Sequence, residues 1–100
     1  MRILGHIHTF NDEAVIDRSL QALLDQSHPL DEILIVDNGS TDGTIRRKFP
    51  ANVTVIRHAE NRGTSGAVNT GFRYASAKQY DWIWILDGDS APRKDALEKL

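Results

Sequence analysis

The chain of 100 residues contains no cysteine, which excludes disulfide bonds and thiolate-ligated metal sites. It has no apolar run long enough to predict a membrane-spanning helix, and its first residues lack the apolar segment of a signal peptide. The formal net charge of −2 gives no electrostatic basis for binding nucleic acid or an anionic membrane. The 40% of hydrophobic residues suffice for a core, and the length predicts one domain or part of one.

The most informative segment is an apolar run, 82–86, followed directly by Asp87, Gly88 and Asp89. Five large apolar residues in a row predict a strand covered on both faces of a sheet. The carboxyl ends of strands are where open α/β sheets bind ligands. Two carboxylates there can hold a hard divalent cation, which in turn can hold phosphates. Acidic residues and glycine are also ordinary turn formers, so these residues alone leave a turn and a metal site equally open.

Four predicted strands alternate with helices along the chain. Strands are expected at 3–8, 32–37, 53–58 and 82–87, and helices at 12–26, 40–48 and 66–78. Alternation at this spacing is typical of parallel βαβ units with right-handed crossovers. The predicted fold class is therefore α/β, with a mostly parallel twisted sheet and helices on both faces.

The predicted helices have apolar faces and end signals. Asn11 and Ser40 are expected to cap the first and second helices, and Pro92 predicts the start of a further one. Inward-facing apolar positions recur at helical spacing in the first, third and last of these helices: Ile16, Leu20, Leu23 and Leu24; Val68, Phe72 and Ala75; Ala96, Leu97 and Leu100.

In a parallel sheet all carboxyl ends of the strands lie along one edge. That edge is expected to gather the segments 9–11, 37–40, 58–63 and 87–89. Asp37 can accept hydrogen bonds from a base or a ribose, although the same segment also predicts a tight turn, with Gly39 allowing a positive φ or a close backbone approach. His6 and His8 share a face of their strand, for which a structural role is favoured over a metal pair. His8 lies nearer the expected ligand edge.

The segment 61–66 is rich in glycine and leads into a predicted helix. Backbone N–H groups at a helix start attract anions, and Arg62 adds a forked cation. The segment is not G-x-G-x-x-G and follows the third strand rather than the first. This disfavours a dinucleotide-binding fold of the usual kind.

These motifs, in this order, resemble family 2 glycosyltransferases with the GT-A fold. The resemblance rests on Thr9-Phe10-Asn11, the segment 36–44, the segment 60–63 with Gly66, Asn69 and Gly71, and Leu86-Asp87-Gly88-Asp89. It covers nearly the whole chain, and the ordered set is far more specific than any single motif. It identifies residues 1–100 as the N-terminal nucleotide-sugar-binding portion of a single GT-A domain.

The resemblance implies an inverting transfer of a sugar from a nucleotide-diphosphate donor to a hydroxyl group of a saccharide or lipid-linked acceptor. Asp87 and Asp89 correspond to the D-x-D motif, which binds Mn²⁺ or Mg²⁺ against the diphosphate. Nucleotide-binding positions are implied at Thr9, Phe10, Asn11, Glu13, Asp37, Asn38, Gly39, Arg62, Gly63, Asp87 and Gly88. Some relatives carry aspartate where this chain has Asn38. The Asp-Asn form points to UDP- or dTDP-linked sugars.

The resemblance also implies parts that lie outside these residues. The general base that deprotonates the acceptor is expected beyond Leu100, together with the acceptor-binding part. Polysaccharide, cell-wall or glycolipid synthesis is the expected setting. The expected location is the cytoplasm or the cytoplasmic face of the membrane, with membrane association of the full-length protein left open.

Two other interpretations compete with this one. A haloacid dehalogenase-like phosphatase also carries an aspartate pair after an apolar strand, but normally on the first strand and not the fourth. A non-catalytic nucleotide- or metal-binding α/β module would bind nucleotide without transferring a sugar.

Overall fold

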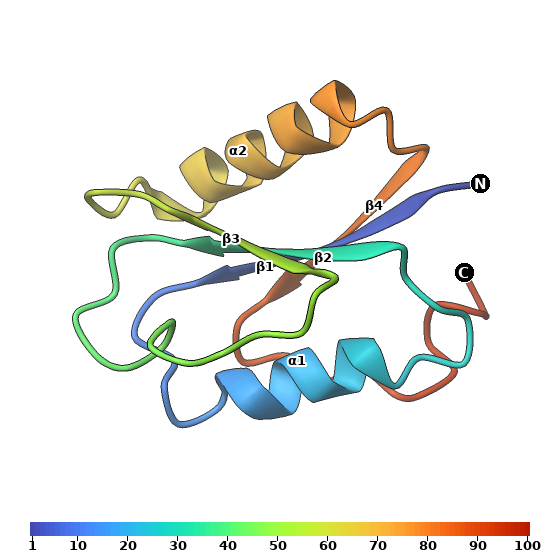
Figure 1. Cartoon of the computed structure of the whole chain (residues 1–100), viewed down its shortest axis with the longest axis horizontal. Coiled ribbons are helices and arrows are strands. Elements are labelled where there is room, and N and C mark those ends of the chain that lie inside the picture. The colour runs from blue at the N-terminus through green and yellow to red at the C-terminus, as the bar shows by residue number, and fades with distance from the viewer.

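The structure, a computed structural model, describes all 100 residues. Its centre is a four-stranded sheet in the order β3-β2-β1-β4 (Figure 1). The strands are β1 (Ile3–Thr9), β2 (Glu32–Asp37), β3 (Val53–Arg57) and β4 (Trp82–Asp87). Every neighbouring pair is parallel, which confirms the predicted fold class. The predicted strands are reproduced to within one residue at each end.

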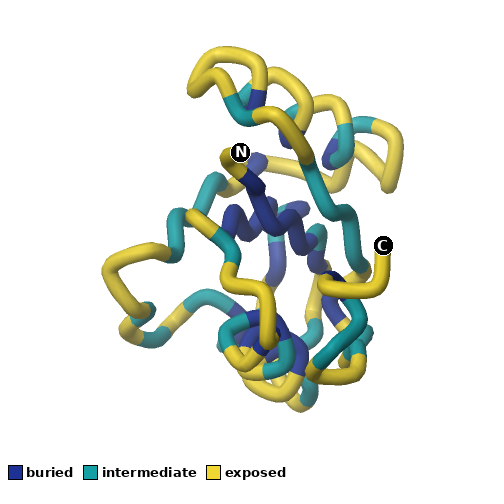
Figure 2. Tube along the Cα trace, turned by 90° about the vertical axis from the view of Figure 1, so that its right-hand side faces the viewer, coloured by how far each residue is buried: buried dark blue, intermediate teal, exposed yellow.

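Two helices cover opposite faces of the sheet, α1 (Ile16–Leu24) on one side and α2 (Gly63–Ala77) on the other (Figure 1). Each helix buries its apolar face against its own side of the sheet, which gives two separate hydrophobic clusters. One cluster contains Ile7, Ile16 and Leu23, and the other contains Leu4 and Ala67. Figure 2 shows the buried residues concentrated in the sheet between the helices. Neither helix is long and apolar enough to cross a membrane.

The first helix is shorter than predicted. It begins at Ile16 and not at Asp12, because residues 13–15 form a turn in which the Asp12 carbonyl accepts the N–H groups of Val15 and Ile16. The expected cap at Asn11 is wrong. Asn11 has a positive φ of 53°, and its Oδ1 accepts hydrogen bonds from the backbone of residues 41 and 42 instead.

No helix forms at 40–48, where residues 41–45 adopt turns and bends. Side-chain acceptors take the backbone N–H groups that a helix would need. Asp37 Oδ2 accepts the N–H of Ser40, Asn11 Oδ1 accepts that of Thr41, and Asp42 Oδ1 accepts that of Thr44. The predicted cap at Ser40 is therefore also wrong, because its hydroxyl donates to Asp37.

The expected helix after Pro92 is absent as well, and residues 94–99 form a series of turns. Gln26 anchors this segment, since its Nε2 donates to the carbonyl of Arg93 and its Oε1 accepts the N–H of Leu97. Leu97 is buried there, whereas Leu100 is exposed.

The third predicted helix is present as α2, but it begins three residues earlier than expected, and of its predicted inward positions only Ala75 is buried. The buried positions are Ala67, Gly71 and Ala75. Phe72, predicted to face the core, is 51% exposed. Small residues on the inward face let the helix approach β1 closely, because a Cβ at Gly71 would collide with the ring of His6.

The prediction that the apolar run 82–86 is covered on both faces is confirmed only in part, since residues 83–86 are half-buried. β4 is an edge strand of the sheet, and Trp82 is 61% exposed. Trp84 and Leu86 still pack against the cluster on the α1 side, and Ile83 packs on the α2 side.

Candidate functional site

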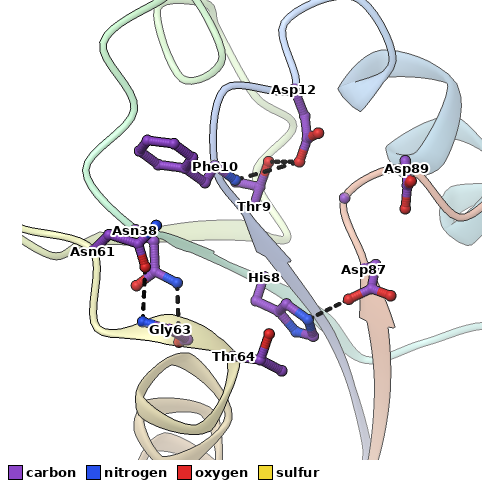
Figure 3. A pocket seen from close by; sticks show the side chains of 11 residues that line it. His8, Thr9, Phe10, Asp12, Asn38, Asn61, Gly63, Thr64, Asp87 and Asp89 are labelled. Atoms are coloured by element: carbon purple, nitrogen blue, oxygen red, sulfur yellow. Dashed lines mark hydrogen bonds and ion pairs between the residues drawn. The ribbon is translucent and has the colours of Figure 1, made fainter.

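The candidate site lies where the order of the strands reverses. The chain leaves β1 for β2 through α1 on one face and reaches β4 through α2 on the other face. The order of the strands thus reverses between β1 and β4, and open α/β sheets bind ligands outside the carboxyl ends of the strands at such a reversal. A hollow of about 340 Å³ opens there (Figure 3). It is lined by His8, Thr9, Phe10, Asp12, Asn38, Asn61, Gly63, Thr64, Asp87, Gly88 and Asp89.

The two aspartates that end β4 enter the hollow from one side (Figure 3). Asp87 is paired in register with His8 on β1, and His8 Nε2 lies 2.5 Å from Asp87 Oδ1. The Nδ1 atom of His8 lies 3.3 Å from Nε2 of the buried His6. Burial, together with the neighbouring His8, lowers the pKa of His6 to about 4. The two histidines thus contact each other within the sheet, and His8 also reaches the site.

The loop after β1 holds the glycine between the two aspartates in place. Thr9 Oγ1 donates to Asp12 Oδ2 at 2.6 Å, and the N–H of Phe10 donates to the same oxygen at 3.3 Å. A Cβ at Gly88 would collide with the side chains of Thr9 and Asp12. On the other side, Ser19 of α1 donates to the carbonyl of Gly88 at 2.7 Å. A larger residue at the centre of this acidic turn would have to displace the side chains of Thr9 and Asp12.

Asn38 enters the hollow from the end of β2 and is tied to the start of α2. Its Nδ2 donates to the carbonyl of Gly63 at 3.1 Å, and its Oδ1 lies 2.9 Å from Nδ1 of His58. His58 in turn lies 2.8 Å from Oγ1 of Thr70. Burial lowers the pKa of His58, and the nearby charge of Arg62 lowers it further. The glycine-rich segment therefore has a fixed position beside the sheet edge.

Seven of the predicted site residues line the hollow: Thr9, Phe10, Asn38, Gly63, Asp87, Gly88 and Asp89. Five others do not line it: Asn11, Glu13, Asp37, Gly39 and Arg62. Of these, Asn11 and Glu13 accept backbone N–H groups of the loop 41–43, and Asp37 is fully buried. The structure gives these three residues roles in holding the loop after β2, and their contacts with a nucleotide remain predictions.

Four residues line the hollow without having been predicted as binding residues: His8, Asp12, Asn61 and Thr64. The sequence placed His8 near the ligand edge and Asn61 within a segment expected there. Asp12 was interpreted as part of a helix. Its side chain accepts hydrogen bonds from the Thr9 hydroxyl and the Phe10 N–H, both earlier in the chain, and these contacts left no signal in the sequence. Thr64 carries no signal either.

The acidic turn fits a hard divalent cation that is shared with a ligand. Asp87 and Asp89 are exposed and offer oxygen donors, which Mg²⁺ and Mn²⁺ prefer. No cluster of three or more potential metal-binding side chains exists in the chain. One or two carboxylates completed by phosphate oxygens and water are the usual way in which Mg²⁺ is held at phosphate sites. The donor set therefore suits a metal that binds together with a diphosphate.

Comparisons with known proteins agree with this geometry. The glycosyl transferase family 2 model matches residues 6–100. The glycosyltransferase AglE from Haloferax volcanii is 35% identical, over 93% of this chain and 32% of its own length. Among solved structures, the mannosyltransferase PcManGT from Pyrobaculum calidifontis, in complex with GDP-Man and Mn²⁺, superposes with a TM-score of 0.82 at 32% identity. That match covers 96% of this chain and 30% of PcManGT.

A second structure, S. aureus TarS 1–349 in complex with UDP, superposes with a TM-score of 0.72 at 27% identity. This match covers 99% of the present chain and 30% of TarS 1–349. The chain thus spans about a third of the length of the proteins it matches. Its parallel sheet with covering helices is that of the GT-A fold. The family match extends over nearly every residue, and the chain belongs to glycosyl transferase family 2.

Proposed function

We propose that the protein transfers a sugar from a nucleotide-diphosphate donor to a hydroxyl acceptor, and that residues 1–100 supply its donor and metal site. The observation that carries this proposal is the hollow at the strand reversal. It brings Asp87 and Asp89 together with Thr9, Phe10 and Asn38 in a chain of this family. The complexes of PcManGT with GDP-Man and Mn²⁺ and of TarS with UDP support the proposal.

Each side of the hollow has a distinct part in this function. Asp87 and Asp89 would hold the divalent cation, Mn²⁺ or Mg²⁺. When bound, that cation neutralises the negative charge that develops on the leaving diphosphate. Phe10, half exposed at the rim, offers a ring face for the nucleobase. Asn38 and the start of α2 contact the nucleoside from the other side.

The inverting mechanism is part of the same proposal. Inversion requires a carboxylate that removes the proton from the acceptor hydroxyl as this oxygen attacks the anomeric carbon. We place this base, and the acceptor-binding part, beyond Leu100. Residues 1–100 are then the donor-binding portion of one GT-A domain, which binds donor weakly and does not turn over by itself. Sugar transfer by these residues alone would contradict this assignment.

The donor base is proposed to be uracil or thymine, from the Asp-Asn pair at 37 and 38. PcManGT carries a guanine nucleotide and TarS a uracil nucleotide, so the base has to be measured for this chain. Calorimetric titration of UDP, dTDP and GDP with Mn²⁺, repeated with EDTA, tests the proposal. We expect binding that needs the metal and that is tightest for UDP or dTDP. The donor site would be contradicted if nucleotide bound equally well in the presence of EDTA, or if the folded protein bound no nucleotide.

A sugar-transfer assay on the full-length protein separates an enzyme from a binding module. The donor that binds tightest in the titrations identifies the nucleotide for the assay, and release of free nucleoside diphosphate is the readout. Metal-dependent nucleotide binding without any such release would favour the non-catalytic module over the transferase.

A further inference from the structure

A buried chain of polar side chains links three elements behind the hollow. It runs from Asn38, after β2, through His58, after β3, to Thr70 on α2. His58 is only 4% exposed and Asn38 only 5% exposed. Polar groups at this depth are costly unless each one has a partner of the right kind, so their hydrogen-bond directions can be worked out.

Two backbone groups decide the orientation of the Asn38 amide. The carbonyl of Gly63 can only accept, so the atom 3.1 Å from it is the amide nitrogen of Asn38. The N–H of Arg62 can only donate, so the atom 3.4 Å from it is the amide oxygen. Both contacts select the same orientation. An aspartate at position 38 would instead place a carboxylate oxygen against the Gly63 carbonyl.

This orientation also decides the tautomer of His58. Since Asn38 Oδ1 can only accept, the proton of the imidazole is on Nδ1, which donates to it at 2.9 Å. The Nε2 atom then accepts the single hydroxyl hydrogen of Thr70 at 2.8 Å, a shorter contact than that of the same hydroxyl with the carbonyl of Gly66 at 3.2 Å. The neutral ring satisfies both contacts. Burial, which disfavours the charged form, lowers the pKa of His58 and acts in the same direction.

After these contacts are counted, the Asn38 side chain has only a hydrogen-bond donor left to offer a ligand. Its oxygen accepts from His58 and from the backbone of Arg62, and one of its two N–H groups donates to Gly63. The remaining polar group is the second N–H. Asn38 lines the hollow, and Figure 3 shows it on the side away from Asp87 and Asp89. This side of the site therefore offers a hydrogen-bond donor.

We propose that His58 is a positioning residue that locks the Asn38 amide, so that the site recognises an oxygen acceptor of the donor's nucleoside, a base carbonyl or a ribose oxygen. This inference rests on the proposed function and adds a residue that does not itself line the hollow. It predicts that His58 acts on recognition of the nucleoside and not on binding of the metal and diphosphate, which is assigned to Asp87 and Asp89.

Two substitutions of His58 provide the test, because each one retains only one of the two hydrogen bonds of the imidazole. His58→Asn retains a donor near the position of Nδ1 and can still bond to Asn38. His58→Gln reaches the position of Nε2 and can still bond to Thr70. Each protein is titrated calorimetrically with UDP and with inorganic pyrophosphate, both in the presence of Mn²⁺, after its melting temperature has been measured.

We expect His58→Gln to weaken UDP binding about tenfold, the effect of losing roughly one hydrogen bond. His58→Asn should stay within about threefold of the wild type by the same scale. Pyrophosphate binding should be unchanged in both. Equal UDP affinity in all three proteins, or an equal loss for UDP and pyrophosphate, overturns the inference.

Asn38→Asp provides the test if His58→Gln does not fold, since it leaves His58 and Thr70 in place. It should lose UDP affinity about tenfold and keep its affinity for pyrophosphate. Unchanged UDP binding in Asn38→Asp overturns the inference. If the wild type binds neither UDP nor pyrophosphate with Mn²⁺, the proposed function itself fails, and the inference fails with it. If the wild type binds UDP and the variants bind it equally well, the role of His58 is refuted and the proposed function stands.

Discussion

The imidazole of His8 on the central strand faces the carboxylate of Asp87 at the end of β4, with Nε2 2.5 Å from Oδ1. The two residues are partners in the parallel register of β1 and β4. The side chain of His8 is largely buried, whereas that of Asp87 is 66% exposed. One oxygen of Asp87 is therefore held by the sheet while the exposed side of the carboxylate is open to a ligand.

Replacing His8 should weaken metal-dependent nucleotide binding. Hydrogen-bonded partners of metal-binding carboxylates typically contribute about 10- to 100-fold to metal affinity. We expect His8→Ala to reduce Mn²⁺-dependent UDP affinity by about tenfold. His8→Gln, which retains a donor at the position of Nε2, should recover most of the loss. Calorimetric titration of Mn²⁺ at saturating UDP measures the effect, and wild-type affinity in His8→Ala would argue against it.

Asp89→Asn should affect binding much more than folding. The Asp89 side chain is exposed and makes no hydrogen bond or ion pair within the chain, so its replacement leaves few contacts to lose. We expect Mn²⁺-dependent UDP affinity to fall by at least about tenfold, as expected for a lost metal ligand, with little change in melting temperature. Asp25→Asn, at an exposed position after α1, is the matched control and should bind normally. Normal binding by Asp89→Asn would remove Asp89 from the metal site.

Gly71→Ala should destabilise the fold although alanine favours helices. A Cβ at this position meets the ring of His6, so α2 has to move away from β1. Overpacking of this kind costs about 1–3 kcal/mol, more than the roughly 1 kcal/mol that helix propensity returns. The free energy of unfolding in urea is the measurement. Asn69→Ala, at an exposed position of the same helix, should be neutral or stabilising. Equal behaviour of the two variants would contradict the close approach.

The stability of the protein should fall on mild acidification because of His6. Its pKa is lowered to about 4 in the folded protein, so between its ordinary pKa of about 6.5 and about 4 only the unfolded chain takes up this proton. Stability is therefore full above pH 6.5 and declines as the pH falls toward 4, by up to about 3 kcal/mol. His58 acts in the same direction.

The comparison of His6→Gln with the wild type measures how much of the acid-induced loss of stability is due to His6. Urea unfolding is measured at pH 7 and pH 5, above the range in which most carboxylates titrate. The variant, which keeps a polar side chain without a titrating ring, should lose less stability between these two values. An identical loss in both proteins would show that His6 is not the group responsible.

The strands and the parallel sheet could be predicted because they follow from local patterns. The run 33–36, for example, is apolar at every position, as a strand covered on both faces requires. The failed helix at 40–48 shows the limit of such patterns. Two of its N–H groups, those of residues 41 and 42, are taken by Asn11, about 30 positions earlier, so the outcome depends in part on a contact that exists only in the fold.

The candidate site could likewise be predicted from the sequence only in part. The convergence of four segments at one edge follows from topology, so the lining by Thr9, Asn38 and Asp87 was foreseeable. The pairing of Asn38 with His58, and of His58 with Thr70, depends on how closely α2 approaches the sheet. The small residues Ala67 and Gly71 allow that approach, and the family motif marks Gly71 without saying what it packs against.

The placement of β4 beside β1 has a consequence for how the protein folds. Ile3 pairs with Trp82, and His8 with Asp87, so these partners in the register are 79 residues apart in the chain. Contacts between such distant positions form late, because both intervening crossovers have to close first. The two halves of the ligand site therefore do not meet until the sheet is complete. Until β4 has paired with β1, Asp87 and Asp89 are not held beside Thr9 and Asn38, so we expect affinity for metal and nucleotide to appear only with the last strand pairing.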